Sequence, residues 1–325
     1  MRAPDFWNGK DYTARFAVNA LTPLGWLYGA VTALKASQAK PYRSNAKVVC
    51  VGNLTAGGSG KTPISITITH ALTARGKQTV ALTRGYGGKM RGPAFVDAKR
   101  DSAIETGDEA LLVASATPTI VARDRADGAR LAEANGAQAI VMDDGHQNFS
   151  LAKDLSIVVI DAETAFGNGR ILPAGPLREA VAQGLARTDA VVLVGDGLPH
   201  LNGFKGTVLR AHLAAVDTLG LAGKRVVAFA GIGRPEKFFQ TLRSLGADLV
   251  EAREYADHHA YTASEIARLK ARANAETALL MTTEKDFVRL TQAERDGISY
   301  LPVRAAFDDQ AAFDALLDRI APRAP

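Results

Sequence analysis

Short apolar runs alternate with helix-competent stretches along most of the chain. This alternation predicts parallel strands joined by helices, the α/β class, because strands buried on both faces appear as continuous apolar runs. The predicted strands are residues 48–51, 79–83, 137–142, 155–160, 191–194, 226–230, 248–250 and 278–283. Between 197 and 224 the rhythm gives way to Gly, Pro and short β-type runs. We therefore expect a larger α/β domain at 41–210 and a smaller C-terminal α/β domain at 211–325.

Residues 16–34 carry no charge and lie between Arg15 and Lys35. On a helix, their apolar and small polar side chains separate onto two faces. One face carries Phe16, Ala20, Leu24, Leu27, Val31 and Leu34, and the other carries Asn19, Thr22, Gly25, Gly29 and Thr32. Trp26 and Tyr28 are residue types that favour the headgroup level, and a basic tail follows at Lys35, Lys40, Arg43 and Lys47.

The two-faced pattern favours an N-terminal amphipathic helix that lies in a membrane interface, and we assign residues 1–40 to this membrane-associating segment. A helix packed on its own domain and a single membrane span are the alternatives. Pro23 and two glycines weigh against the span, because proline interrupts the hydrogen bonds of a helix interior.

Composition narrows the class of protein. Of the 325 residues, 47% are hydrophobic and 22% are charged, which is typical of a folded globular protein. The net charge of +5 is too small to indicate a nucleic-acid partner, but it suits an anionic substrate or an anionic membrane surface. The single Cys50 excludes a disulfide framework and indicates a reducing compartment. We expect no cleavable signal peptide, and no obligate protein partner is evident.

A glycine-rich run, Gly57-Gly58-Ser59-Gly60-Lys61-Thr62, follows strand 48–51 and precedes the predicted helix 64–74. A strand that turns through glycines into a helix directs unpaired N–H groups at one point, which favours a phosphate group. Lysine adds a charge for the β and γ phosphates, and the threonine hydroxyl can bind Mg²⁺. A strict Walker A motif would have glycine at Thr55, so an ordinary Gly/Ser turn is the alternative.

Strand 137–142 leads directly into Asp143 and Asp144. An apolar strand that ends in aspartate is the Walker B arrangement, in which a carboxylate reaches Mg²⁺. Paired aspartates at a turn also occur without any function. Because the lysine–threonine loop is present in the same chain, we expect a P-loop NTPase-like, mainly parallel sheet with flanking helices that binds ATP and Mg²⁺.

Three further segments suit a transferase that closes over two substrates. The turn at 84–88 ends a predicted strand, a long Pro/Gly loop occupies 167–179, and a histidine pair lies at 257–259. Asp108, after Gly107, can be a simple helix cap, which is the commonest role of such an aspartate. The guanine-reading Asn/Thr-Lys-x-Asp motif is absent, and the nearest string, at 283–286, has the wrong order, which lowers the case for a GTPase.

The segments with unusual composition follow one another in a recognisable order. They are residues 51–63 (VGNLTAGGSGKTP), 84–88 (RGYGG), 107–109 (GDE), 143–145 (DDG), 172–179 (LPAGPLRE), 257–259 (DHH) and 283–286 (TEKD). In these segments the chain resembles the tetraacyldisaccharide 4'-kinase family of lipid A biosynthesis. The family also departs from a strict Walker A at the position of Thr55, so this departure does not count against the motif.

The resemblance implies transfer of the ATP γ-phosphoryl group to the 4'-hydroxyl of a tetraacylated glucosamine disaccharide 1-phosphate, which yields lipid IVA. It implies that Asp108 is the general base and that His258 or His259 assists it. The implied nucleotide loop is Thr55, Ala56, Gly57, Gly58, Ser59, Gly60, Lys61 and Thr62. Thr62 with Asp143 or Asp144 would bind Mg²⁺. The family often has histidine at the position of Asn148, so we assign no role there.

A substrate with four acyl chains stays in a bilayer. The resemblance therefore favours the interfacial interpretation of residues 16–34 and a location at the cytoplasmic face of the inner membrane, peripheral or monotopic. Two other functions remain as alternatives. One is a P-loop kinase of a soluble metabolite, and the other is a nucleotide-gated membrane scaffold that transfers no phosphoryl group.

Overall fold

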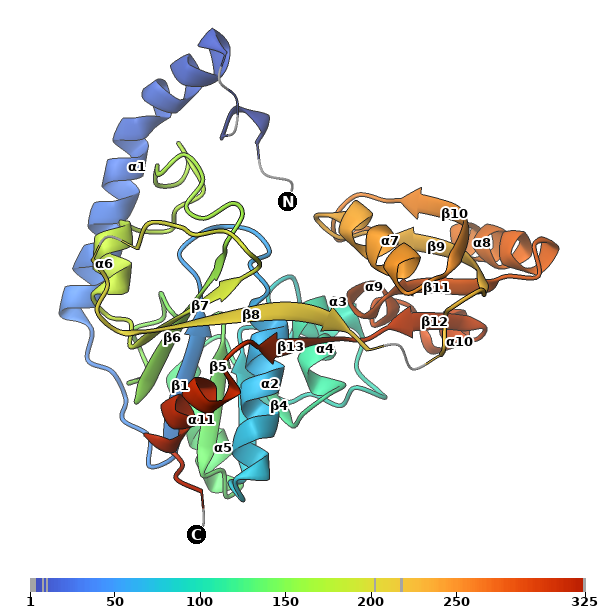
Figure 1. The fold of residues 1–325 in the computed structure, drawn as a ribbon. Coiled ribbons are helices and arrows are strands. Elements are labelled where there is room, and N and C mark those ends of the chain that lie inside the picture. The colour runs from blue at the N-terminus through green and yellow to red at the C-terminus, as the bar shows by residue number, and fades with distance from the viewer. Residues whose placement is uncertain (1–3, 8, 10, 202, 217–218, 324–325) are drawn as a thin grey trace.

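A computed structural model describes residues 4–7, 9, 11–201, 203–216 and 219–323. The chain forms a nine-stranded sheet of order β13-β8-β7-β6-β1-β5-β2-β4-β3 and a four-stranded sheet of order β10-β9-β11-β12. In Figure 1 the smaller sheet, with its helices in orange and red, lies to one side of the larger sheet, and the blue N-terminal helix runs along the opposite side. The predicted α/β fold, with a large, mainly parallel sheet and a smaller C-terminal sheet, is confirmed.

The strands of the larger sheet are β1 (Lys47–Gly52), β2 (Thr79–Thr83), β3 (Ala94–Phe95), β4 (Thr119–Val121), β5 (Ala139–Asp143), β6 (Leu155–Asp161), β7 (Ala190–Val194), β8 (Thr207–Ala215) and β13 (Val303–Phe307). Only β3 and β13, at the two edges, pair antiparallel with their neighbours. The smaller sheet consists of β9 (Arg225–Ala230), β10 (Asp248–Glu254), β11 (Leu279–Thr283) and β12 (Ile298–Leu301), all parallel.

The helices are η1 (Asp5–Trp7), α1 (Tyr12–Gln38), α2 (Lys61–Ala74), α3 (Ala103–Thr106), α4 (Asp108–Ala114), α5 (Arg125–Ala134), α6 (Val181–Leu185), α7 (Pro235–Ser244), α8 (Ala263–Ala275), α9 (Glu284–Phe287), α10 (Gln292–Arg295) and α11 (Gln310–Asp318). Helices α2 and α11 pack on one face of the larger sheet, and α5 packs on the other. The central strands are therefore buried on both faces, as their continuous apolar runs predict.

The last part of the chain returns to the larger sheet. The boundary predicted between residues 210 and 211 falls inside β8, which pairs with β7 on one side and with β13 on the other. Phe313, Leu316 and Leu317 of α11 join the core cluster that contains Val49 of β1. By sheet membership, the smaller unit therefore comprises β9 to β12. The sequence break at 197–224 concealed this because β8, which lies next to the edge strand β13, is not a continuous apolar run; several of its side chains are exposed.

Helix α1 is longer than the predicted 16–34 and continues through Pro23. It packs on the protein through its small residues: a Cβ atom added to Gly25 would lie 2.8 Å from the carbonyl oxygen of Ile171. The opposite face leaves Phe16, Leu24 and Leu27 more than half exposed. Within the predicted segment 1–40, residues 1–3, 8 and 10 lie outside the described residues. None of the described helices is long and apolar enough to cross a membrane.

Candidate active site

The loop between β1 and α2 has the geometry of a phosphate-binding turn. Helix α2 begins at Lys61, so Lys61 and Thr62 lie in its first turn. Its N-cap, Gly60, has a φ of 82° and makes no side-chain capping hydrogen bond. Gly57 has a φ of 126°, which favours glycine, and a Cβ at Gly57 or Gly58 would meet no atom within 4 Å. The space beside Gly57 and Gly58 is therefore open, and the first turn of α2 that follows is where an anion would bind.

The first half of this loop is held by the segment at 172–179. Thr55 forms an antiparallel bridge with Leu177, and the N–H of Ala56 donates to the carbonyl of Pro176 at 2.7 Å. The N–H of Arg178 donates to the carbonyl of Leu54 at 2.8 Å. An extended, paired backbone suits threonine well, so the position of Thr55 does not need the glycine of a strict Walker A motif.

The buried side chain of Asn53 supports the same loop through a hydrogen bond. The side-chain amide of Asn53 donates to the Ser59 hydroxyl at 3.2 Å, and both residues are buried. The Oδ1 atom of Asn53 is buried without a hydrogen-bond partner. Buried polar atoms are rarely left unpaired, so this atom is consistent with a ligand or water at the loop.

Asp143 ends β5, which lies directly beside β1 with Asp143 in register with Val51. Its carboxylate is buried and accepts a hydrogen bond from Ser65 of α2 at 2.7 Å. Burial, together with the negative charge of Glu109, raises the pKa of Asp143 to about 6. A cation bound nearby would stabilise the charged form of such a buried carboxylate.

Asp144 is the next residue and has a φ of 52°, in the left-handed region that few residues other than glycine adopt. Arg178 donates to both of its carboxylate oxygens, at 2.9 and 3.1 Å, and the Lys61 ammonium lies 3.7 Å away. Burial alone would raise the pKa of Asp144, but these two cations outweigh it and lower the pKa. Asp144 therefore stays ionised and joins the phosphate loop to the 172–179 segment.

The carboxylates of Asp143 and Asp144 lie next to the start of α2, where they contact Ser65 and Lys61, but they do not form a complete metal site. Among the described residues, no group of three or more His, Cys, Asp or Glu side chains could hold a metal ion. Mg²⁺ at kinase sites is typically bound by one or two carboxylates, with water and the phosphates of the substrate as further ligands. Thr62, Asp143 and Asp144 carry oxygen atoms of the type that such a donor set uses.

Asp108 is the first residue of α4, and Gly107, with a φ of 87°, is its N-cap. A Cβ at Gly107 would lie 2.4 Å from the carbonyl oxygen of Tyr86, and one at Gly88 would lie 2.5 Å from the carbonyl carbon of Thr106. The glycines thus let the 84–88 turn lie directly against the backbone that carries Asp108. Helix capping is not the main role of this side chain: Oδ1 accepts from the N–H of Glu109 at 2.9 Å, whereas Oδ2 faces the smaller sheet.

Three basic side chains of the smaller sheet surround Oδ2 of Asp108. His258 Nδ1 lies 2.8 Å away, Arg289 Nη2 lies 2.6 Å away, and Lys285 Nζ lies 4.0 Å away. Burial alone would raise the pKa of Asp108, but the hydrogen bond from His258 and the charges of Lys285 and Arg289 hold it well below its usual value. Asp108 is therefore a permanent anion at neutral pH and a weak proton acceptor by itself.

The two histidines of the 257–259 segment lie in different surroundings. His258 has a φ of 60°, and its backbone N–H donates to the carbonyl of Gly231, which turns its ring toward Asp108. His259 instead lies 3.2 Å from a carboxylate oxygen of Glu265 and stacks on the ring of Tyr255. The structure thus brings His258 to Asp108 and leaves His259 in the smaller sheet's own packing.

Sequence reasoning assigned no role to three cations at this site. Arg178 and Lys285 lie inside the LPAGPLRE and TEKD segments, so those segments were the available signal. Arg289 lies three residues beyond the second segment, where nothing in the sequence pattern marks it. Its partners Asp108 and Asp286 are adjacent only in the folded chain, and α4 packs against α9 there.

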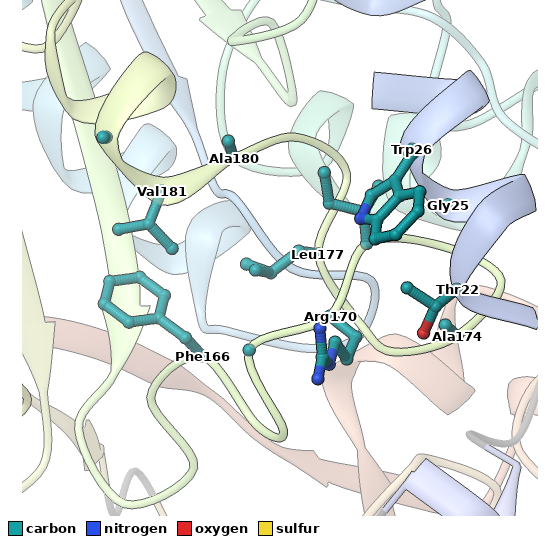
Figure 2. A pocket seen from close by; sticks show the side chains of 12 residues that line it. Thr22, Gly25, Trp26, Phe166, Arg170, Ala174, Leu177, Ala180 and Val181 are labelled. Atoms are coloured by element: carbon teal, nitrogen blue, oxygen red, sulfur yellow. The ribbon is translucent and has the colours of Figure 1, made fainter. Parts of the chain in front are cut away.

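A cavity of about 420 Å³ lies between α1 and the loop that precedes α6. Figure 2 shows Thr22 and Trp26 of α1 on one side and Phe166 and Val181 on the other, with Arg170 also in the lining. The lining is mainly apolar with one cation, a combination that suits an amphiphile with an anionic group.

Comparisons with known proteins agree with this geometry. The family described as LpxK, tetraacyldisaccharide-1-P 4'-kinase, matches residues 17–321. A protein of Rhodospirillum rubrum named tetraacyldisaccharide 4'-kinase is 46% identical over 98% of this chain and 98% of its own length. A protein of the same name from Rhodospirillum centenum is 48% identical over 98% of this chain and 96% of its own length.

The fold also matches a solved structure. The crystal structure of the "apo" form of LpxK from Aquifex aeolicus in complex with ATP superposes with a TM-score of 0.78 and is 26% identical, covering 94% of this chain and 99% of that one. Matches over nearly the whole length, in sequence and in structure, confirm the resemblance inferred from the motifs. The chain belongs to the tetraacyldisaccharide-1-P 4'-kinase family.

Proposed function

We propose that this chain is an ATP-dependent kinase that phosphorylates the 4'-hydroxyl of tetraacyldisaccharide 1-phosphate and thereby forms lipid IVA in lipid A biosynthesis. Family membership supports the activity. The observation that carries the chemistry is the 2.8 Å contact between Asp108 and His258, two residues from different sheets, in a chain that also has a phosphate loop. A proton acceptor and a phosphate site together are what phosphoryl transfer to an alcohol requires.

The donor half of the site is the loop from Thr55 to Thr62. Backbone N–H groups at the start of α2 would bind the phosphates of ATP, and Lys61 would place its charge on the β and γ phosphates. Thr62, with Asp143 or Asp144, would hold Mg²⁺. When bound, the cation would neutralise charge on the phosphate oxygens. The ion pair with Arg178 fixes Asp144 beside Lys61 and keeps it ionised for this role.

The acceptor half uses Asp108 and His258 together. The sugar oxygen attacks the γ-phosphorus, the bond from that phosphorus to the ADP oxygen breaks, and the hydroxyl proton must leave. Asp108 is too weakly basic to hold this proton alone, because its pKa is strongly depressed. With Asp108 at Nδ1, His258 is oriented as a base that can take the proton on Nε2, and Asp108 stabilises the cationic ring that results. This refines the sequence-based assignment of Asp108 as the base, and we assign no catalytic role to His259.

The acyl chains of the acceptor substrate would lie near α1. The exposed apolar face of α1 would lie in the cytoplasmic face of the inner membrane, where Lys35, Lys40, Arg43 and Lys47 would meet anionic headgroups. The apolar cavity beside Trp26 would accept part of an acyl chain, with Arg170 near the polar end of the lipid. The substrate would then reach the catalytic pair without leaving the bilayer.

The direct test is incubation of the full chain with ATP labelled in the γ-phosphate and with tetraacyldisaccharide 1-phosphate in mixed micelles. We expect label in the lipid, and we expect Lys61→Ala to abolish the transfer. Transfer to a water-soluble sugar but not to the lipid would favour a kinase of a soluble metabolite. Binding of ATP without transfer to any acceptor would favour a nucleotide-gated scaffold. Either result would overturn the proposal.

A further inference from the structure

We propose that Arg289 is a positioning residue for the reaction: it ties Asp108 to a buried anchor in the smaller sheet and so fixes the Asp108–His258 pair. The inference rests on the proposed function, because it assigns a task at the same site. Arg289 lies just beyond α9, its side chain is only 7% exposed, and the carboxylates of two different structural units share it.

The guanidinium of Arg289 uses all of its nitrogens. Nε and Nη2 donate to Oδ2 of Asp108 at 3.0 and 2.6 Å. Nη1 donates to Oδ1 of Asp286 at 2.6 Å and to the carbonyl of Gly231 at 2.8 Å. One rigid, planar group thus joins α4 of the larger sheet to the end of β9 and to α9 of the smaller sheet.

Asp286 is the fixed point of this arrangement. Its side chain is fully buried, and Oδ2 accepts from the Thr283 hydroxyl at 2.6 Å and from the N–H of Gly231 at 3.0 Å. Its other oxygen accepts from the Tyr261 hydroxyl at 3.0 Å. A carboxylate held by so many donors cannot rotate, so it determines where the plane of the Arg289 guanidinium lies.

Gly231 connects this anchor to the proposed base. Its carbonyl accepts from Arg289 and also from the backbone N–H of His258, at 3.1 Å. The same few atoms therefore set the position of the His258 backbone and the position of the cation that holds Asp108. The Asp108–His258 pair and its anchor, Asp286, form one unit that extends across both sheets.

Lys285, which is also close to Asp108, cannot replace Arg289. Lys285 carries a charge, but its ammonium lies 4.0 Å from Asp108, 3.6 Å from Glu109 and 3.5 Å from His258 Nε2, and it lacks the planar fork of a guanidinium. A lysine at position 289 would keep the charge but could not bond two carboxylates and a carbonyl in one plane. The geometry of the guanidinium, and not its charge alone, therefore performs the task.

The nearby packing keeps the two sheets together independently of Arg289. Val288, the preceding residue, is buried with Leu111 and Leu112 of α4. On another part of the interface, Arg234 and Lys237 of the smaller unit pair with Glu163, at 3.3 and 2.8 Å. Substitution of Arg289 should therefore disturb the Asp108–His258 pair more than the contact between the sheets.

The test compares Arg289→Lys with Arg295→Lys in the full chain, by steady-state transfer from ATP to tetraacyldisaccharide 1-phosphate. Arg295 is a matched control, because it is a partly buried arginine in the same segment that donates to the backbone carbonyls of Phe287 and Val288. We expect Arg289→Lys to lower kcat about 10- to 100-fold, as loss of hydrogen bonds between charged groups does, with the KM for ATP within about twofold. Arg295→Lys should leave both constants near wild type.

A second variant tests whether the anchor acts through Arg289. Tyr261→Phe removes one hydrogen bond to Asp286 and keeps the ring, so we expect a smaller fall in kcat. In an Arg289→Lys background it should cause almost no further fall, since both changes break the same chain of contacts.

Three outcomes would overturn the inference. One is wild-type kcat in Arg289→Lys. The second is a loss of kcat accompanied by an equal rise in the KM for ATP and a lower Tm, which would assign a merely structural role. The third is independent, additive losses in the double variant. If the wild-type chain itself transfers no phosphoryl group to the lipid, the proposed function fails first, and the two failures are thus distinguishable.

Discussion

The exposed face of α1 makes a quantitative prediction for membrane binding. Leu24 and Leu27 are 54% and 63% exposed, so together they present slightly more than one whole leucine side chain to the surroundings. Transfer of one leucine side chain out of water contributes about 2 kcal/mol. The double change Leu24→Ser and Leu27→Ser should therefore weaken partitioning onto vesicles by about 30-fold, since each 1.4 kcal/mol is a factor of ten.

The assay is cosedimentation of the full chain with vesicles of phosphatidylethanolamine and phosphatidylglycerol over a range of lipid concentrations. The control is Asn19→Ser, an exposed polar position on the same helix. Because α1 packs on the protein through Thr22, Gly25 and Gly29, the double variant should keep its Tm. Unchanged partitioning would refute the membrane role of this face. A fall in Tm together with weaker partitioning would show that the two leucines stabilise the fold instead.

Three further predictions concern the site and its supports. Asp108→Ala should lower kcat by at least about 10³-fold while the Kd for ATP stays near wild type, because Asp108 belongs to the proposed acceptor half of the site and not to the phosphate loop; kinetics with an equilibrium binding assay would check this, and near-wild-type turnover would contradict it. Gly107→Ala should lower the free energy of unfolding by about 1–3 kcal/mol in urea titrations, because its φ of 87° and the carbonyl of Tyr86 leave no room for a Cβ; an unchanged midpoint would count against it. Burial lowers the pKa of His146 to about 3, so between that pH and about 6.5 the unfolded chain binds a proton that the folded chain does not, and stability falls as the solution is acidified. His146→Asn should flatten this loss of stability between pH 7 and 4 in urea titrations, and an unchanged slope would assign it to other groups.

The parts of the fold that could be predicted depend on local pattern. The strands before the phosphate loop and before Asp143 are continuous apolar runs, and the loop itself needs its glycines in one order, so the sequence identifies both. β8 and β13 were not predicted as members of the larger sheet. They pair with each other across some ninety residues of intervening chain, and strands at or next to the edge of a sheet, with partly exposed side chains, lack the apolar signal.

The choice between His258 and His259 shows the same limit at the level of a single side chain. The two residues are adjacent and chemically identical, and only the backbone turn at His258, fixed by the carbonyl of Gly231, decides which ring meets Asp108. Arg289 is a stronger case, because Asp108 lies far from it in the sequence and meets it only where the two sheets are in contact. Local chemistry can thus be predicted from the sequence, whereas contacts between the sheets require the structure.

The position of the Asp108–His258 pair has a consequence for how the proposed reaction avoids hydrolysis of ATP. Asp108 belongs to α4 of the larger sheet, and His258 and Arg289 belong to the smaller one, so the pair exists only while the two sheets are in contact. The phosphate loop, in contrast, lies entirely within the larger sheet and needs no such contact to bind ATP. ATP bound to a chain whose sheets are apart would face water without a base to activate it. In the proposed mechanism, activation of the sugar hydroxyl is thereby tied to the contact between the two sheets, which would favour transfer to the sugar over transfer to solvent.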